Sequence, residues 1–445
     1  MKRSITMMKI GVFLGLLAET YLNAALPSLM VHFNVPAEKL QWLTSLYILT
    51  MGLSVPISAF LIRRTTAKEL FLGAITLFLV GTVLGGFAPS FSVLLIARII
   101  QAAGASMTLP LMIHSIMATY EKGEQGKAMG SAMLVILFAP AIGPSVGALI
   151  LELLSWRWIF LSTAALLLAL LIWSSYSMEQ TTEKEVIKVD FLSIALSIIG
   201  FGALVYGLQQ LLSGQTSSTI AIILTLIGIA GIWWFVLRQK TLTNPMLSLV
   251  PLSQPTFALG AFLIIVTHLV VFGSFIMLPM YLVQTFNTSS LFAGLALLPG
   301  GFIGAAAPTL AGRIYDRRGP KHIVLLGFFL LITANFLFSL THYHQSPLFI
   351  ILIYMLLMAG FGVTLTPLQT HSLSQLEKTQ LGSGTAILNT AMLIASSMGG
   401  SLFIALFAAK SAKATFEGGV AHAYTVTAAV ACVGLLGALF FAKKE

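Results

Sequence analysis

Long apolar stretches separated by short polar gaps recur along the whole of this 445-residue chain. A helix needs roughly 20 mostly apolar residues to cross the hydrocarbon core of a bilayer. The chain holds enough such stretches to predict fourteen membrane-spanning helices. Only 9% of the residues are charged, whereas a soluble protein carries about 25%. The pattern therefore predicts an all-α polytopic membrane protein, and it excludes ordinary soluble enzymes.

Lysine and arginine set the predicted orientation. If the N-terminus is cytoplasmic, most of the 24 basic residues, Lys9 among them, fall on the cytoplasmic side of the spans. This asymmetry is typical of membrane proteins and predicts a multi-pass protein of the cell membrane with both termini in the cytoplasm. The first apolar stretch is too long for a cleaved signal peptide, so we expect it to be retained.

The sequence offers little to hold a metal, a cofactor or a nucleic acid. Cys432 is the single cysteine, and no histidine pair has the spacing of a metal site. No Gly-x-x-x-x-Gly-Lys-Ser/Thr run is present to bind ATP phosphates. The net charge is +10, but the basic residues lie in the gaps between spans and form no continuous basic face. We therefore expect no metal, no cofactor and no nucleic-acid partner.

Two internal echoes indicate a duplication. Gly312–Lys321 is echoed by Ala59–Lys68, and Gly104–Pro110 is echoed by Gly360–Pro367, at nearly the same offset. Duplicated halves with a substrate site between them are common in transporters. The expected division is an N-terminal six-helix half (1–178), a cytoplasmic linker (179–190), a two-helix insert (191–237), a second cytoplasmic linker (238–256) and a C-terminal six-helix half (257–445).

The repeated run resembles a loop motif of the major facilitator superfamily, Gly-x-x-x-Asp-Arg-x-Gly-x-Lys/Arg. The residues that match it are Gly312, Asp316, Arg317, Gly319 and Lys321. An Asp beside helix ends can pair with an arginine and latch two helices at the cytoplasmic face. In the first-half copy Arg63 takes the place of the Asp and Thr66 that of the second Gly. We expect the latch on the C-terminal half.

Three further motifs resemble the fourteen-helix drug:proton antiporters of that superfamily. Arg98–Ala105 is similar to the fourth-helix motif Arg-x-x-Gln-Gly. Gly143, Pro144 and Gly147 match the fifth-helix antiporter motif, in which small residues and a proline favour a helix seam and a hinge. Leu17–Pro27 resembles the first-helix signature, with its acid displaced by one position to Glu19.

The resemblance implies a fold of two six-helix pseudo-repeats with a two-helix insert. It also implies a monomeric secondary active transporter that exports amphipathic, cationic drugs or dyes in exchange for protons by alternating access. One alternative keeps the fold but carries an endogenous metabolite, lipid or signalling nucleotide. A second, a non-transporting sensor or enzyme, lacks any nucleophile–base or metal arrangement in the sequence.

Glu19 is the only acid that falls near the middle of a predicted span. An intramembrane carboxyl is a functional-site hypothesis by default, because burial favours its neutral form and lets it exchange a proton. Arg98 also falls within a span, so the two are expected to act in proton coupling, with a purely structural Glu19–Arg98 pair as the alternative. His268 is a third candidate, against hydrogen-bonded packing as its alternative.

Aromatic and amide side chains within the spans are candidates for a substrate pocket. Aromatic faces attract cations, and amides add hydrogen bonds, although each side chain could equally face lipid or a neighbouring helix. The candidate substrate-binding residues are Glu19, Tyr21, Asn23, Trp42, Tyr47, Gln101, Phe138, Phe272, Phe275, Gln369 and Asn389. Expected partners are small amphipathic molecules, protons and membrane lipids.

Overall fold

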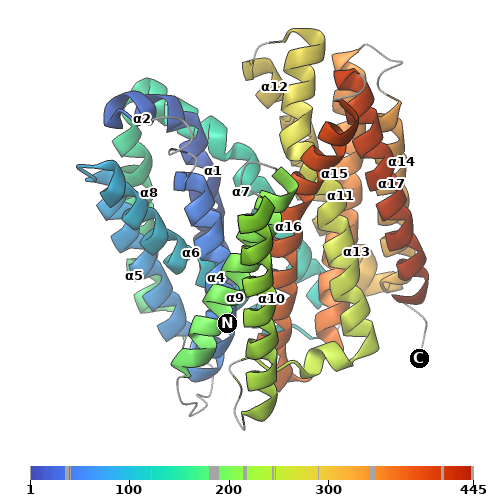
Figure 1. Ribbon diagram of the computed structural model, residues 1–445. Coiled ribbons are helices and arrows are strands. Elements are labelled where there is room, and N and C mark those ends of the chain that lie inside the picture. Colours follow the sequence, from blue (N-terminus) through green and yellow to red (C-terminus); the bar gives the residue numbers. More distant parts are fainter. Residues whose placement is uncertain are drawn as a thin grey trace.

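The computed structural model describes residues 2–35, 40, 42–121, 123–179, 190–213, 218–242, 245, 247–288, 290–340, 346–411 and 415–441. Within these ranges every regular element is a helix. The first group of helices, blue to teal in Figure 1, comprises α1 (Lys2–Thr20), the 3-10 helix η1 (Tyr21–Ala25), α2 (Leu26–Phe33), α4 (Trp42–Arg64), α5 (Ala67–Gly86), α6 (Phe91–Thr119), α7 (Gln125–Leu153) and α8 (Trp156–Ser177).

A second group, yellow to red in Figure 1, lies beside the first. It comprises the 3-10 helix η2 (Val250–Ser253), α11 (Pro255–Phe286), α12 (Ser290–Ala296), α13 (Leu298–Arg318), α14 (Lys321–Ser339), α15 (Pro347–Ser374), the 3-10 helix η4 (Lys378–Gln380), α16 (Leu381–Ser411) and α17 (Phe416–Phe441). Between the groups in sequence come α9 (Phe191–Ser213) and α10 (Ser218–Thr241).

The described helices confirm a multi-pass membrane protein. Ten of them are long and apolar enough to cross a bilayer, and the bent helix α7 makes an eleventh. The expected fourteen crossings would also need the interrupted first helix, α4 and α9. The last two contribute shorter apolar stretches, Trp42–Ser54 and Leu192–Leu208.

One sequence expectation is corrected by the helix boundaries. Most of the run Gly312–Lys321 is helix and not loop, because α13 continues to Arg318 and α14 begins at Lys321. Gly319 ends α13 with a φ of 75°, a backbone conformation that glycine adopts at little cost. Lys9 lies within α1, where its ammonium donates to the Ser131 hydroxyl of α7 at 2.7 Å.

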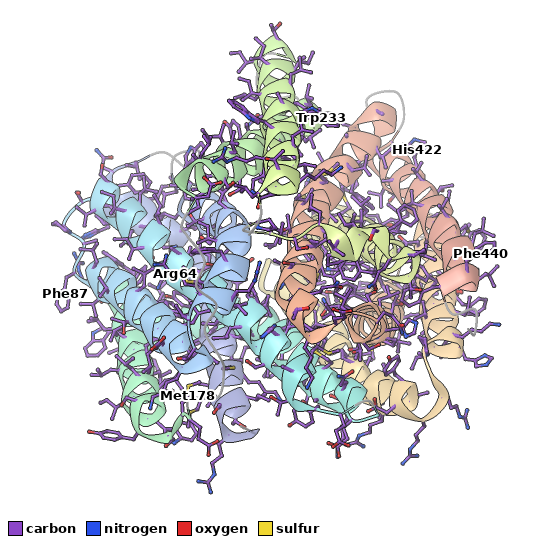
Figure 2. The ribbon with its side chains drawn as sticks, turned by 90° about the horizontal axis from the view of Figure 1, so that it is seen from below. Arg64, Phe87, Met178, Trp233, His422 and Phe440 are labelled. Carbon is purple, nitrogen blue, oxygen red and sulfur yellow. The ribbon has the colours of Figure 1, made fainter. Side chains whose placement is uncertain are left out.

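Helices α9 and α10 bridge the two groups at one side of the molecule (Figures 1 and 2). Tyr206 of α9 stacks on Trp42 of α4, with 6.1 Å between ring centroids. One apolar cluster joins the pair to both groups through Phe60 of α4 and Ala386 of α16. Trp233 of α10 is 66% exposed and lies at the outer edge in Figure 2, as expected for a lipid-facing surface.

An ion pair fastens the ends of α9 and α10 to each other. The Arg238 Nε and Nη2 atoms donate to the two carboxylate oxygens of Asp190 at 2.7 and 3.0 Å. The Ser193 hydroxyl donates to the same carboxylate at 2.7 Å. Mainly through the Arg238 contact, these groups lower the pKa of Asp190 from 3.8 to about 2.

We expect Asp190→Asn to lower the melting temperature of the purified protein at pH 7. A depressed pKa means that the ionised Asp190 stabilises the folded state above about pH 4, and that this contribution is lost as the pH falls toward 2. The difference in melting temperature between wild type and variant should shrink across that interval. A difference that does not vary with pH would contradict this assignment.

Candidate functional site

Arg98 of α6 lies in the interior of the first helix group. Its side chain is fully buried, and its guanidinium donates to three acceptors. Nε binds the Leu43 carbonyl of α4 at 3.1 Å, and Nη1 binds the Ala18 carbonyl of α1 at 2.9 Å and the Gln101 side-chain oxygen at 2.6 Å. One buried charge thus joins α1, α4 and α6.

Two tyrosines complete the surroundings of Arg98. The guanidinium lies 4.0 Å from the ring centroid of Tyr47, a cation–π distance, and the Tyr47 hydroxyl donates to the Gly15 carbonyl at 2.8 Å. The Gln101 amide nitrogen donates to the hydroxyls of Thr82 at 2.9 Å and Tyr21 at 3.4 Å. Three predicted substrate residues, Tyr21, Tyr47 and Gln101, are therefore already hydrogen-bonded inside the helix group.

Glu19 lies in the last turn of α1, directly after the Ala18 carbonyl that binds Arg98. It is partly exposed and lies within electrostatic range of Arg98. Among the described residues, however, the two side chains form no ion pair, and Nη2 of Arg98 has no hydrogen-bond partner. Glu19 is thus placed to influence Arg98 without being neutralised by direct contact.

The chain deforms on both sides of the contact between the first helix and α7. Immediately after Glu19 and Thr20, the α-helix gives way to the 3-10 helix η1. Opposite it, α7 bends by 49° between Gln125–Pro140 and Ser145–Leu153. A Cβ atom on Gly143 would collide with Thr20, and one on Gly147 would collide with the Tyr21 carbonyl. The antiporter-like glycines thus form a backbone seam at the bend.

Asp316 joins the other end of α7 to the second helix group. Its two carboxylate oxygens accept hydrogen bonds from the backbone amides of Gly126 at 2.9 Å and Lys127 at 2.8 Å. Glu124, the residue that precedes α7, provides no side-chain cap. Asp316 of α13 therefore caps α7 from the other group, and its negative charge suits a helix N-terminus.

Glycines allow this approach of α13 to α7. A Cβ on Gly312 would collide with the Gly126 carbonyl.

The sequence predicted that Asp316 would bind an arginine, and the structure corrects this partner. Among the described residues the carboxylate binds main-chain amides, while Arg317 and Lys321 are exposed. In the first-half copy, Arg63 donates to the Pro245 carbonyl at 3.0 Å and Thr66 caps α5.

Aromatic side chains gather in the second helix group. His268 of α11 is buried, contacts the Ile264 carbonyl at 2.8 Å and stacks on Phe272 with 5.4 Å between ring centroids. Phe275 lies 5.2 Å from Phe272, and Phe361 of α15 lies 5.3 Å from His268. These contacts match the packing alternative for His268.

The remaining candidates lie in separate places. Phe138 of α7 contacts Phe302 of α13, with ring centroids 5.6 Å apart, and so lies between the two groups. Gln369 and Asn389 are buried on α15 and α16. Trp42 faces α9. The side chains of Asn23 and Pro144 lie outside the described part of the structure.

The structure thus gathers Tyr21, Tyr47 and Gln101 around Arg98 and Phe272 and Phe275 beside His268, and it places the other described candidates elsewhere. Sequence reasoning also missed two polar residues that the structure connects: Thr82, which accepts from Gln101, and Lys9, which binds Ser131 across α1 and α7. The sequence signal that Lys9 lies inside a helix and not in a loop was its apolar neighbours, Met8 and Ile10. Among the described residues, no group of three or more His, Cys, Asp or Glu is arranged to hold a metal ion.

Comparisons with known proteins agree on one family. A model described as Major Facilitator Superfamily matches residues 9–400. The lincomycin resistance protein LmrB of Bacillus subtilis is 36% identical, over 97% of this chain and 94% of its own length. The multidrug export protein EmrB of Haemophilus influenzae is 26% identical, over 89% of this chain and 78% of its own.

Two solved structures show the same fold. The human organic anion transporter MFSD10 superposes with a TM-score of 0.73 at 15% identity and covers 98% of this chain and 99% of its own. The proton:xylose symporter XylE superposes with a TM-score of 0.68 at 16% identity, over 99% of this chain and 95% of its own.

We expect Gly147→Ala to impair the protein strongly, because the added Cβ meets the backbone of Tyr21, which cannot move aside as a flexible side chain can. Overpacking of this kind costs about 1–3 kcal/mol. Gly73→Ala on α5 is the matched control, since nothing lies within 4 Å of its Cβ position. Fluorescence-detected size-exclusion chromatography on heated samples measures both variants. Equal stability of the two would refute the seam.

Proposed function

Because this chain belongs to the Major Facilitator Superfamily and is a membrane transporter, not an enzyme, we propose that it exports amphipathic, cationic drugs or dyes in exchange for protons. The names of its relatives support a drug as cargo, since one is a lincomycin resistance protein and another a multidrug export protein. The observation that carries proton exchange is the position of Glu19, beside a buried arginine and next to the bend of α7.

The proposed topology has fourteen crossings. The interrupted first helix, α4 and α9 would add to the eleven apolar spans, and α9 with α10 would form an insert between two six-helix halves. The glycine seams support the duplication. Gly104 of α6 lies against the backbone of α5, and Gly360 of α15 lies against that of α14. We place the protein in the cell membrane as a monomer with both termini in the cytoplasm.

In the proposed mechanism, Glu19 alternates between a protonated and an ionised form. The ionised carboxylate attracts the Arg98 guanidinium, which is bound to the Ala18 carbonyl at the end of α1. A proton on Glu19 removes that attraction. The change acts on the junction of α1 and η1, which lies against the glycines of α7. Proton exchange is thereby linked to the bend of α7.

The other end of α7 carries the proposed cytoplasmic latch. The Asp316 carboxylate holds the N-terminus of α7 against α13. Opening the cytoplasmic side requires these charge-assisted hydrogen bonds to break. Because α7 connects the Glu19 region with the latch, a change at the bend can alter the angle at which α7 meets α13. Alternating access then follows as the rocking of one half against the other.

If Glu19 is the proton site, Glu19→Gln should abolish dye efflux driven by a pH gradient in everted vesicles. The amide imitates the protonated form and cannot release a proton, yet insertion should survive because a neutral amide is less costly to bury than a carboxylate. Glu121→Gln, which changes an exposed acid at the end of α6, is the control and should transport normally. Full pH-driven efflux by Glu19→Gln at normal expression would eliminate this mechanism.

The double variant Glu19→Gln with Arg98→Gln separates proton exchange from structural pairing. If the two residues only balance each other's charge, removing both charges restores stability and much of the efflux. A proton site requires the opposite result, which is a double variant without coupled transport even when it folds. The amount of folded protein in the membrane and the efflux rate are measured on the same vesicle preparation.

Asp316→Asn should slow efflux without preventing membrane insertion. The amide loses the charge that favours the N-terminus of α7, an interaction worth about 0.3–2 kcal/mol, and keeps only one acceptor oxygen. Arg63→Ala tests the corresponding position of the first-half copy and should have the smaller effect. Should Arg63→Ala prove the more damaging, the latch has been placed on the wrong half.

A further inference from the structure

Buried hydroxyl groups in the second helix group differ in how they are bonded. Some bond to their own helix: Thr267 donates to the Leu263 carbonyl at 2.8 Å and Thr364 to the Gly360 carbonyl at 2.7 Å. Another set, on α15 and α16, has polar atoms without a hydrogen-bond partner among the described residues. These atoms are Oγ1 of Thr366, Thr370 and Thr385, Oγ of Ser372, Oε1 of Gln369 and Nδ2 of Asn389.

None of these six side chains is more than 2% exposed. Buried polar atoms are nearly always hydrogen-bonded in proteins, because leaving one unpaired costs free energy. A single exception can be local strain. The Ser372 hydroxyl lies against Gly260 of α11. The other five polar atoms, on two neighbouring helices, indicate a place where another molecule supplies the missing donors and acceptors.

The two sets of polar residues face each other. The Gln369 amide nitrogen of α15 contacts the Met392 sulfur of α16 at 2.7 Å. Thr366 and Thr370 lie one turn or less from Gln369, on the same face of α15. On α16, Thr385, Asn389 and Met392 likewise follow one another at intervals of one turn. Because Gln369 and Met392 touch, the two polar stripes point toward each other.

Apolar side chains flank the two polar stripes at both ends. Toward η4, Leu373, Leu376 and Phe257 crowd around Gly384 of α16. Toward the other end of α15 lies the aromatic cluster of Phe361, Phe272 and His268. The unpaired groups between these ends are hydroxyls, one amide oxygen and one amide nitrogen, all neutral. They suit hydroxyl and amide groups of a ligand better than a formal charge.

We propose that these polar groups form a hydrogen-bonding subsite that selects cargo carrying hydroxyl or amide groups. The inference rests on the proposed export function and refines its substrate class. It also assigns cargo selection by hydrogen bonds to the second helix group and not to the first. Tyr21, Tyr47 and Gln101 of the first group are engaged around Arg98, whereas Gln369 and Asn389 of the second group retain unused hydrogen-bonding atoms.

Two probes of contrasting chemistry test the subsite. Lincomycin carries several hydroxyls and an amide, and tetraphenylphosphonium is a lipophilic cation with no hydrogen-bonding group. Binding of each is measured with the purified full chain in lipid nanodiscs. The test variant is Thr366→Val with Thr370→Val, which removes two hydroxyls at nearly constant shape. Thr364→Val is the control, because its hydroxyl already serves its own helix.

The double variant should weaken lincomycin binding by about tenfold or more and leave tetraphenylphosphonium binding within about twofold of wild type. The control should change neither. The melting temperature of the double variant should equal or exceed that of wild type, because the two substitutions remove unpaired buried hydroxyls. This separates a lost subsite from a damaged fold.

The opposite outcomes overturn the inference. Unchanged lincomycin binding, or an equal loss for both probes, shows that the hydroxyls do not select cargo. A wild-type protein that binds tetraphenylphosphonium but not lincomycin overturns the subsite and leaves drug export standing. A folded wild-type protein that binds neither probe overturns both proposals.

Discussion

The buried positive charge of Arg98 is the constraint on which the first helix group depends. A guanidinium inside an apolar bundle is costly unless its donors are bonded. Here main-chain carbonyls of α1 and α4, the Gln101 oxygen and the Tyr47 ring together surround it. These contacts fix where α1 ends relative to α4 and α6, and therefore where Glu19 and η1 lie.

Helix α7 connects that region with the second helix group. At its bend, glycines replace side chains where it meets η1, and at its first turn a glycine meets α13. Gly147 meets the Tyr21 backbone and Gly126 meets the Gly312 backbone, so these two contacts cannot absorb a shift by repacking side chains.

Much of this architecture was predictable from the sequence. The apolar stretches located the membrane helices, and the motif residues led to Arg98, to the α7 glycines and to Asp316. The partners of these residues were not predictable, because they depend on helices far apart in sequence. Asp316 was expected to bind an arginine and instead caps α7, while the bond of Gln101 with Arg98 was not foreseen.

Residue type alone also could not show which buried polar side chains have a hydrogen-bond partner and which have none. Thr364 and Thr366 are two positions apart on one helix, yet the first bonds its own backbone and the second has no partner among the described residues. The χ1 angle of each threonine decides this difference, and the residue type carries no information about it. Trp42 illustrates the same limit, since its partner Tyr206 lies on α9.

The cap on α7 has a consequence for how this protein tolerates mutation. The acceptor is one side chain, Asp316, but the donors are main-chain amides, which every amino acid except proline supplies. A substitution of Lys127 by any residue except proline therefore keeps the backbone amide that donates to Asp316. Substitution of Gly126 is restricted by its closeness to Gly312 and not by the hydrogen bond. Sequence variation can therefore weaken this joint through α13 far more readily than through α7.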